Sequence, residues 1–372
     1  MSGFWDGRRV LVTGNTGFKG AWLCLWLQHL GAEVSGLALP PQTTPSLYDT
    51  AGPWPGQDHR YVDIRDALAV TAAMAAIRPE LVFHLAAQAL VRPSYADPIA
   101  TFATNVMGTL HVLDAARSLP GVAAVVVVTT DKVYENHHHG TPFAEGDRLG
   151  GKDPYSSSKA CAELATQSFR DSFLGNGAAP VVATARAGNV VGGGDWSQDR
   201  LIPDIIRAHA AGKPVMLRYP EAIRPWQHVL EPLHGYLMLA RQIVEAPTKA
   251  PLAVNFGPDP ESFSSVSEVV DRVSAAFDGR PGWQRAPGTH LPEAKTLTLS
   301  SDLARRTLGW QPRLTMQETI GWTADWYRDF AAGRDARQLA LAQIVQYHDR
   351  GAASLNRAPL TSPPLTSSQE PR

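Results

Sequence analysis

The sequence predicts an α/β fold in which a doubly wound parallel sheet is followed by a smaller C-terminal domain. Short apolar runs rich in β-branched residues alternate with longer stretches of helical spacing through the first half of the chain. Continuous apolar strands separated by helices are typical of a parallel sheet that is covered on both faces. After about residue 187 the pattern changes to loops rich in glycine and proline, which indicates a second domain.

Length and composition limit the kinds of function. At roughly 150 residues per domain, the 372 residues form about two domains. The 34 Lys and Arg against 35 Asp and Glu give no electrostatic preference for nucleic acid or an anionic membrane, so we expect a small-molecule partner. No signal peptide and no apolar run of membrane-spanning length is apparent, and two cysteines fit a reducing cytoplasm.

The expected elements begin with one βαβ unit, formed by a strand over residues 8–12, a helix over 19–30 and a strand over 33–37. The helix has one apolar stripe at helical spacing, made of Trp22, Leu23, Trp26, Leu27 and Leu30. Further strands are expected at 81–85, 124–129 and 181–186, between helices at 66–77, 98–118 and 154–173. In the second half, helices are expected near 202–211, 232–246 and 266–277.

A glycine-rich turn stands between the first strand and the first helix. It reads Thr13-Gly14-Asn15-Thr16-Gly17-Phe18-Lys19-Gly20. Gly14 permits the tight turn, Gly17 lets backbone N–H groups approach a pyrophosphate at the positive helix end, and Gly20 lets helix and strand pack closely. Because a strand precedes and a helix follows, the turn predicts a dinucleotide site in a Rossmann sheet; glycines that merely turn the chain are the alternative.

The choice of NAD over NADP has weaker support. The second strand ends in Gly36-Leu37-Ala38-Leu39, without the carboxylate that binds the adenosine ribose and without an arginine for a 2′-phosphate. Asp63, which follows a third strand, can hydrogen-bond the adenine amino group, or it is a solvated loop acid.

These features set the expected domain boundaries. We expect residues 1–187 to form the NAD-binding Rossmann domain, with a return of the chain near 228–257, and residues 188–350 to form the substrate domain. Residues 351–372 are rich in Ser, Thr and Pro without periodicity. We expect a disordered tail there, because such a segment buries too little surface to offset its ordering entropy.

Tyr155 and Lys159 form a YxxxK pair in the helix expected over 154–173. Four residues are just over one helical turn, so the two side chains share a face. A tyrosine needs its pKa lowered by about three units to act as a base at pH 7. We expect a neighbouring ammonium and the positive nicotinamide to lower it. Helices contain YxxxK by chance, so its weight comes from its position after the fifth strand.

Thr130, Asp131 and Lys132 follow the apolar run 124–129. In open parallel sheets, ligands bind outside the carboxyl ends of the strands. There Thr130 can hydrogen-bond a substrate hydroxyl, Asp131 can give or take a proton, and Lys132 can act as a base only if burial lowers its pKa. The alternative is a solvated turn.

Several motifs together resemble a known superfamily. They are TGxxGxxG, His84-Leu-Ala-Ala-Gln88, Asn105-Val-Met-Gly108, Thr130-Asp131, YxxxK and Arg186-Ala-Gly-Asn189. This set is similar to that of the extended short-chain dehydrogenase/reductase superfamily, over about residues 8–345. The longer stretches TGNTGFKGAWLCLWL, GNVVGGGDW, DRLIPD and IRPWQHVLEP, with the Thr-Asp-Lys triplet, resemble the CDP-glucose 4,6-dehydratases of the NAD-dependent epimerase/dehydratase family.

The resemblance implies a hydro-lyase that acts on CDP-glucose with NAD as cofactor. Tyr155, aided by Lys159, would take the proton of the 4-hydroxyl, held by Thr130, while C4 passes hydride to NAD⁺. Asp131 would protonate the departing C6 hydroxyl, and the hydride would return to C6. Lys132 stands where related dTDP-sugar dehydratases carry a glutamate base, which leaves the C5 base open. The product, CDP-4-keto-6-deoxyglucose, belongs to deoxysugar biosynthesis, including that of lipopolysaccharide O-antigen.

The resemblance also implies two groups of binding residues. The expected cofactor residues are Gly14, Thr16, Gly17, Phe18, Lys19, Gly20, Asp63, Ile64, Leu85, Ala86, Ala87, Thr104, Tyr155 and Lys159. The expected substrate residues are Gln88, Arg92, Ser94, Asn189, Arg200, Leu201, Arg218 and Arg224. Arginines such as Arg218 and Arg224 suit bidentate pairing with phosphate oxygens, or they are surface charges.

Other interpretations remain open at this point. One is another nucleotide-sugar 4,6-dehydratase or a 4-epimerase; Asp131 argues against the epimerase, which needs no acid for a departing hydroxyl. Another is a dinucleotide sensor, against which the intact Tyr155 and Lys159 argue. The run His137–139 has no completing ligand set, so we expect no metal. The resemblance implies a homodimer in which the helices at 98–118 and 154–173 pair across a two-fold axis.

Overall fold

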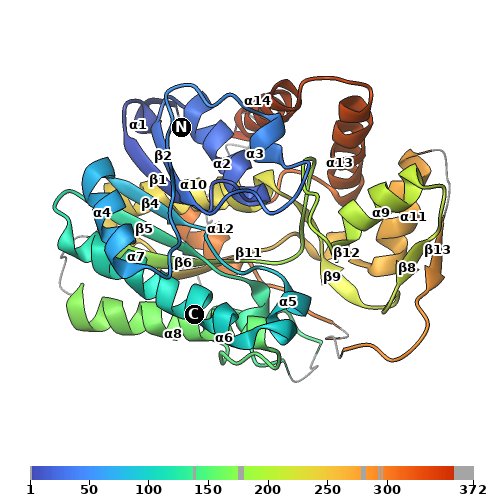
Figure 1. The fold of residues 1–372 in the computed structure, drawn as a ribbon, viewed down its shortest axis with the longest axis horizontal. Helices are drawn as coiled ribbons and strands as arrows, with labels where there is room; N and C mark the ends of the chain where they lie inside the picture. Colours follow the sequence, from blue (N-terminus) through green and yellow to red (C-terminus); the bar gives the residue numbers. More distant parts are fainter. Residues whose placement is uncertain are drawn as a thin grey trace, which may run out of the picture.

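The centre of the molecule is a seven-stranded sheet in which all neighbouring strands run parallel (Figure 1). The computed structural model describes residues 2–136, 140–174, 180–277, 282–291, 294 and 296–355. In spatial order the strands are β11 (Ala253–Phe256), β6 (Val181–Ala187), β5 (Ala124–Val128), β4 (Leu81–His84), β1 (Arg9–Thr13), β2 (Glu33–Ala38) and β3 (Asp58–Tyr61). The predicted α/β, doubly wound fold is confirmed, and each predicted strand boundary lies within one residue of the observed one.

The strand order creates a crevice at the carboxyl end of β1. From β1 the chain passes outward to β2 and β3 and then returns to β4 on the other side of β1. Ligands of open α/β sheets bind at such a point, because the two loops that leave it diverge. The edge strand β11 comes from the second half of the chain and pairs with β6, so the chain re-enters the sheet within the segment 228–257.

Alternate side chains of the strands enter two separate cores. Val10 packs with α2 and α10 on one face, whereas Leu11 packs with α4 and α7 on the other. This alternation is the two-residue period of a strand, and it explains why both faces of the central strands β1, β4 and β5 are apolar. The four helices are α2 (Phe18–His29), α10 (Leu230–Glu245), α4 (Ala67–Ile77) and α7 (Gly108–Ser118).

Helix α2 is buried on all sides and not along a single stripe. The predicted stripe, Trp22, Leu23, Trp26, Leu27 and Leu30, is buried, but so are Ala21, which precedes it, and Cys24 and Leu25, which lie between its members. The reason is that α2 contacts β1, β2 and α10 and also α14 (Ala336–Leu355). The prediction of one stripe was wrong, because a helix covered on opposite sides becomes apolar all round.

The C-terminal helix also changes two expected boundaries. Residues 336–350, expected in the second domain, pack on α2, and α14 continues to Leu355, so the helix extends beyond the expected start of a disordered tail at residue 351. The remainder of that expected tail, 356–372, lies outside the described residues.

The single helix expected over 98–118 is interrupted in its middle. It consists of α6 (Pro98–Phe102), a π-helical turn η1 (Ala103–Met107) and α7. A π turn adds a residue to the helical repeat and re-aims the side chains that follow it, and such turns are common at functional sites. The apolar spacing of the sequence gave no sign of it.

A smaller lobe lies beyond the carboxyl ends of the strands, on the right in Figure 1. The elements near it are β7 (Val190–Val191), α9 (Leu201–Ala210), β8 (Val215–Leu217), β9 (Ile223–Pro225), β10 (Gln227–His228), β12 (Phe263–Ser265), α11 (Val266–Ala276), β13 (Trp283–Arg285) and α13 (Met316–Ala331). The three helices predicted in this half are found within two residues of their expected bounds, although α10 covers the sheet. One long helix remains, α8 (Pro154–Phe173). The remaining short elements are α1 (Ser2–Trp5), α3 (Leu47–Thr50), α5 (Val91–Ala96), η2 (Asp131–Val133), η3 (Pro247–Lys249), η4 (Pro260–Ser262) and α12 (Asp302–Leu308).

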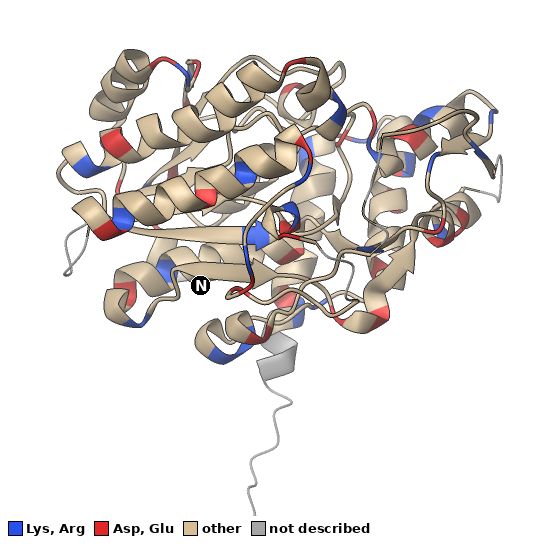
Figure 2. Ribbon diagram, turned by 90° about the horizontal axis from the view of Figure 1, so that it is seen from below, with Lys and Arg blue, Asp and Glu red and all other residues tan. Residues whose placement is uncertain are grey.

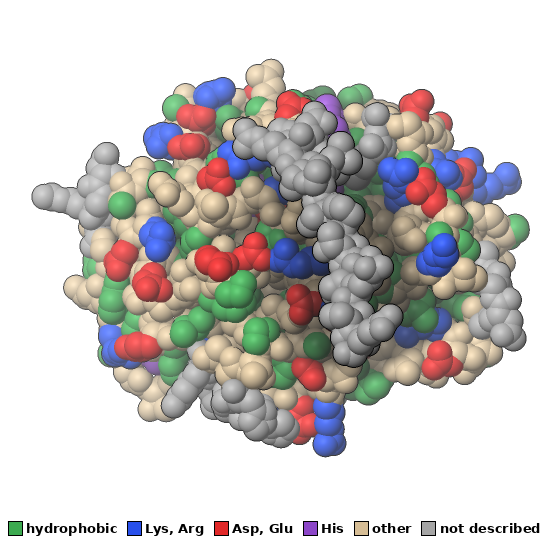
Figure 3. Space-filling model, turned by 180° about the vertical axis from the view of Figure 1, so that it is seen from behind, with side chains coloured by type: hydrophobic (Ala, Val, Ile, Leu, Met, Phe, Trp, Pro, Cys, Tyr) green, Lys and Arg blue, Asp and Glu red, His purple; other side chains and the backbone are tan. Residues whose placement is uncertain are grey.

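Charges of both signs are spread over both parts of the molecule (Figure 2), and on the rear face they alternate with small groups of hydrophobic side chains (Figure 3). This matches the net charge of -1. Within the described residues, no helix combines the length and the apolar character needed to cross a bilayer.

A buried carboxylate fastens α14 to the rest of the fold. Glu231 is 1% exposed and accepts hydrogen bonds from the backbone N–H groups of Arg313 and Leu314, both at 2.8 Å, and from the Tyr347 hydroxyl at 2.6 Å. Burial raises the pKa of Glu231 to about 7, although these donors oppose the shift.

Protonation of Glu231 therefore makes stability depend on pH. Between its ordinary pKa of 4.5 and about 7, the folded protein keeps a proton that the unfolded chain releases, so this group destabilises the fold as pH rises through that interval. We expect the difference in free energy of unfolding between the Glu231→Gln variant and wild type to change with pH. Across this interval it should shift in favour of the variant by up to about 3 kcal/mol as pH rises. Urea unfolding at several pH values measures it, and a difference that is constant with pH would contradict the assignment.

Candidate active site

The carboxyl ends of the strands open into a cavity of about 1300 Å³ between the sheet and the smaller lobe. Its lining includes the glycine-rich turn, the segments after β2, β4 and β5, the start of α8 and the loops on both sides of α9. The predicted site residues other than Ser94 line this cavity, so segments more than 200 residues apart in sequence meet at one place.

The glycine-rich turn has the shape that a dinucleotide requires. Gly14 has φ +73°, and a Cβ there would lie 2.7 Å from the backbone nitrogen of Ala86. A Cβ on Gly20 would lie 2.1 Å from the carbonyl oxygen of Gly14. Gly17 is the N-cap of α2, and no side chain caps that helix end. Backbone N–H groups at an uncapped helix N-terminus suit a pyrophosphate, so the turn fits the dinucleotide.

The adenosine end of the cavity holds the remaining predicted cofactor contacts. Thr16 fixes the turn through a 2.8 Å hydrogen bond from its hydroxyl to the carbonyl oxygen of Leu39. Asp63 accepts hydrogen bonds from the Arg65 guanidinium at 2.6 and 2.9 Å, and this pairing lowers the pKa of Asp63. Contact of Asp63 with the adenine amino group stays a prediction. The other predicted cofactor residues that line this cavity are Phe18, Lys19, Ile64, Leu85, Ala86, Ala87 and Thr104.

The π turn connects the loop after β4 with α8. Asn105, next to Thr104, accepts from the Gln88 backbone N–H at 2.8 Å and donates to the Gln88 carbonyl at 3.0 Å. Its amide also donates to the hydroxyl of Ser158 at 2.9 Å. The Gln88 side chain is itself engaged, because it donates to Thr101 and accepts from Leu90. Gln88 lines the cavity and also holds the loop after β4 in place. The sequence analysis predicted substrate binding for Gln88 but not this structural role.

Tyr155 and Lys159 lie on one buried face at the start of α8, as predicted. The Lys159 ammonium donates to the Val128 carbonyl at the end of β5, at 3.1 Å. Ser94, predicted to bind substrate, is fully buried away from the cavity, and its hydroxyl accepts from the backbone N–H of Tyr155 at 3.1 Å. Its contact with substrate stays a prediction, and in this structure Ser94 anchors the helix end that carries the tyrosine.

The chain alone does not make Tyr155 basic. Burial raises the pKa of Tyr155 to about 12, although hydrogen bonding with Thr130 and the charge of Arg200 lower it. Burial also lowers the pKa of Lys159 to about 8, against the attraction of Glu163, which raises it. The expected lowering of the tyrosine pKa is therefore absent here, because removal of water from a phenolate outweighs the neighbouring charges.

Asp131 is arranged to hold a proton. The side chain is 1% exposed, its Oδ1 accepts from the Thr130 hydroxyl at 3.0 Å, and its Oδ2 has no hydrogen-bond partner among the described residues. Burial raises the pKa of Asp131, while Lys132, Arg224 and Lys19 lower it. A buried carboxyl with a raised pKa and an unsatisfied oxygen in a cavity is suited to exchange a proton with a ligand.

Glu163, which the sequence analysis did not select, fixes α8 to the sheet. Both carboxylate oxygens accept from the guanidinium of Arg186, each at 2.9 Å, and the group is also bonded by the hydroxyls of Thr129 and Thr184 at 2.5 and 2.6 Å. Glu163 and Arg186 are 4% and 3% exposed. Lys159 is one helical turn before Glu163, so this pair also sets its position.

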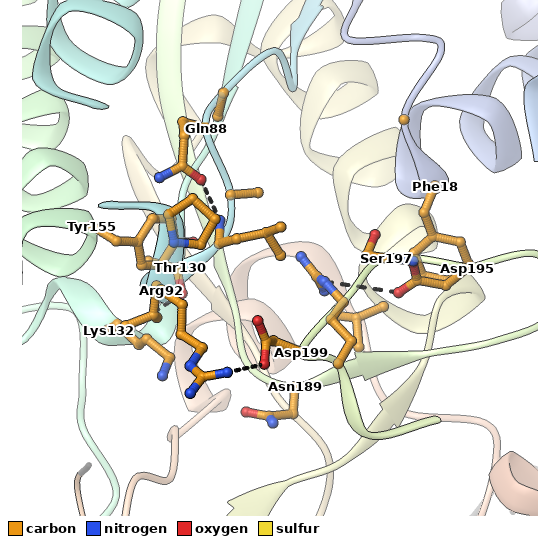
Figure 4. A pocket seen from close by; sticks show the side chains of 18 of the residues that line it. Phe18, Gln88, Arg92, Thr130, Lys132, Tyr155, Asn189, Asp195, Ser197 and Asp199 are labelled. Atoms are coloured by element: carbon orange, nitrogen blue, oxygen red, sulfur yellow. Dashed lines mark hydrogen bonds and ion pairs between the residues drawn. The ribbon is translucent and has the colours of Figure 1, made fainter. Parts of the chain in front are cut away.

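Arginines surround the part of the cavity nearest the smaller lobe. Asp199 bridges two of them: it lies 2.7 Å from the guanidinium of Arg92 on α5 (Figure 4). It also lies 3.3 Å from the guanidinium of Arg218, which follows β8. Asp199 has φ +59°, an uncommon conformation for a non-glycine residue. The pair with Arg92 joins the two parts of the molecule across the cavity mouth. In the sequence, the only signal for Asp199 was its position at the start of the charged DRLIPD motif.

The other predicted substrate residues lie around this group. Asn189 lines the same cavity, and Leu201 begins α9. The Arg200 guanidinium is 3.8 Å from the carboxylate of Asp195, and Arg224 is buried and close enough to Asp131 to lower its pKa. All four line the cavity.

Metal ligands do not cluster in the described part of the chain, where no group of three His, Cys, Asp or Glu side chains is placed to hold an ion. The run His137–139 lies outside the described residues.

Comparison with known proteins identifies the family. Residues 10–257 match the model of the NAD dependent epimerase/dehydratase family. The chain belongs to this family. It is 42% identical to the CDP-glucose 4,6-dehydratase of Salmonella typhimurium over 92% of this chain and 97% of that protein. It is 28% identical to the dTDP-glucose 4,6-dehydratase of Xanthomonas campestris pv. campestris, over 85% and 92% of the two chains.

A solved structure supports the same assignment. The UDP-glucose 4-epimerase of Thermus thermophilus, in complex with NAD, superimposes with a TM-score of 0.73 at 26% identity, over 86% of this chain and 99% of that one. The predicted resemblance and the predicted cofactor are thus confirmed: the chain is an NAD-dependent enzyme of the epimerase/dehydratase family.

The Glu163–Arg186 pair gives a test of how α8 is held. We expect Glu163→Gln to lower the free energy of unfolding by about 3–5 kcal/mol, because it leaves the Arg186 guanidinium buried without its counter-charge. Guanidinium chloride or urea unfolding of the purified variant measures the loss.

The double variant Glu163→Gln with Arg186→Met is the matched control. It removes both charges, so it should recover much of the lost stability. A single variant as stable as wild type would contradict the role given to the pair.

Proposed function

We propose that this enzyme is a hydro-lyase that converts CDP-D-glucose to CDP-4-keto-6-deoxy-D-glucose. The observation that carries the proposal is the buried, protonation-prone Asp131 with its unpartnered Oδ2, next to Thr130 and Tyr155. A departing hydroxyl needs such an acid. The 42% identity to a CDP-glucose 4,6-dehydratase over nearly the whole chain supports the substrate.

Oxidation at C4 begins the reaction. NAD, held at the glycine-rich turn by Gly14, Gly17 and Gly20, would supply the reversible hydride acceptor that a dehydration without net redox change requires. Tyr155 removes the proton of the sugar 4-hydroxyl. Thr130, which forms a hydrogen bond with the phenol of Tyr155, orients the same sugar hydroxyl. Lys159 keeps a positive charge beside the tyrosine. Because the pKa of Tyr155 is raised in the chain alone, the charge that makes it basic must come with the bound cofactor and substrate.

Elimination follows from the acidity that a 4-ketone gives the C5 proton. Asp131 donates its proton to the leaving C6 oxygen, and water departs. Lys132, the next residue on η2, is the group that we assign to remove the C5 proton. The two side chains follow each other on one short turn, so the acid and the base can act on neighbouring carbons.

The arginines at the smaller lobe bind the diphosphate. Arg92 and Arg218 already share one carboxylate, Asp199, and a diphosphate that enters between them replaces it as their partner. Asn189 and Arg200 extend the same wall of the cavity. The remaining substrate contacts that we propose are Leu201, Arg224 and Gln88.

A panel of nucleotide sugars tests the function. We expect the purified enzyme with NAD⁺ to remove one water from CDP-glucose, read as a mass loss by mass spectrometry. dTDP-, UDP- and GDP-glucose at the same concentration are the comparison. Dehydration of only a sugar with another base would overturn the CDP assignment, and inversion at C4 without water loss would favour an epimerase.

Asp131→Asn is the matched variant for this experiment. It keeps the side-chain volume but cannot donate the acid proton, so we expect water loss to slow by about 10²-fold or more. Oxidation at C4, seen as the absorbance of the reduced cofactor after substrate is added, should persist. Full-rate formation of the dehydrated product by this variant would show that Asp131 is not the acid.

We propose a homodimer through the helices that flank η1 and through α8. These surfaces carry exposed apolar side chains, namely Ile99, Met107, Leu164 and Phe173. At micromolar concentration, light scattering should give twice the chain mass, and Leu164→Asp should shift the protein toward the monomer. A monomeric wild-type enzyme would refute this arrangement.

A further inference from the structure

Lys19 is a charged residue of the glycine-rich turn whose ammonium lies among the catalytic groups. It is the second residue of α2, between Phe18 and Gly20. Its Nζ donates to the hydroxyl of Tyr236 at 3.0 Å and lies 5.3 Å from the centre of that ring. Tyr236 is completely buried on α10. The backbone of the turn and this hydroxyl thus fix the side chain at both ends.

The charged groups that face Lys19 are those of the reaction. Burial lowers its pKa most, Arg200 at the N-cap of α9 and Lys159 on α8 lower it further, and Asp131 on η2 raises it. The result is a pKa of about 7. Its partner Tyr236 lies close enough to Tyr155 for the two phenols to interact electrostatically. The four-carbon stem therefore carries the ammonium toward Tyr155.

We propose that Lys19 sets the redox preference of the bound cofactor. The nicotinamide of NAD must lie near Tyr155 to accept hydride from the carbon whose hydroxyl Tyr155 deprotonates. A cation held at that end of the cavity repels the positive oxidised ring and leaves the neutral reduced ring unaffected. Lys19 thereby favours the reduced cofactor, which the enzyme must retain while water leaves the sugar. Tyr236 is its positioning residue.

This proposal depends on the family's cofactor and not on CDP-glucose, so it can fail or succeed separately from the proposed function. The probes are NADH and NAD⁺ alone, bound to the full chain after removal of copurified nucleotide. Fluorescence titration gives the dissociation constant of NADH, and displacement of NADH gives that of NAD⁺. The quantity of interest is the ratio of the two constants.

At pH 6, below the pKa of about 7 so that Lys19 is mostly protonated, we expect Lys19→Met to lower the ratio of the NAD⁺ to the NADH dissociation constant by about three- to tenfold, the size of one unit charge acting through a partly polar medium. Lys19→Gln should behave in the same way, and Lys19→Arg, which keeps the charge, should retain most of the wild-type ratio. Lys152→Met removes a lysine from the exposed rim of the same cavity and should leave the ratio unchanged.

Three results would overturn the proposal. Equal weakening of NADH and NAD⁺ in Lys19→Met would show that the ammonium pairs with the pyrophosphate that both forms share. A ratio lowered as much in Lys19→Arg as in Lys19→Met would show that shape and not charge is responsible. An equal change in Lys152→Met would show that any positive charge of the cavity has this effect. Thermal melting curves confirm that each variant is folded.

Discussion

The buried ion pair between Glu163 and Arg186 is the interaction on which the arrangement of the catalytic groups depends. It joins α8, which carries Tyr155 and Lys159, to the ends of β5 and β6. Two buried charges are costly to remove from water, and this cost is offset only because the guanidinium and two threonine hydroxyls satisfy the carboxylate completely. Rigid placement of Tyr155 and Lys159 is the result, since a helix fixed to the strand ends cannot slide along them.

The exclusion of water from the cavity side chains also determines their protonation. Burial pushes the phenol of Tyr155 and the carboxyl of Asp131 toward their protonated forms and the amines of Lys19 and Lys159 toward their neutral forms. The protonation of each of these groups therefore responds strongly to a charge that enters the cavity. A positive nicotinamide and a diphosphate are such charges. Under the proposed function, the chain provides the acid directly, whereas the basicity of Tyr155 depends on the ligands.

Sequence patterns predicted the parts of the structure that local spacing determines. Strand positions, the glycine-rich turn and the common face of Tyr155 and Lys159 follow from periods of two and about four residues, and the structure has them. Contacts between distant segments were missed. Ser94 beneath the Tyr155 backbone and Asp199 between two arginines depend on how separate loops meet. The all-round burial of α2 likewise depends on α14, which lies more than 300 residues later.

The glycine-rich turn combines the glycines that a dinucleotide requires with one charged side chain, Lys19. Gly14 and Gly20 leave no room for a Cβ, so the backbone of the turn is fixed by sterics. The position between Phe18 and Gly20 has no such limit, and here it holds a lysine long enough to reach Tyr236. Binding of the dinucleotide and adjustment of its redox preference can thus be separated within one turn, because backbone atoms perform the first and a single side chain performs the second.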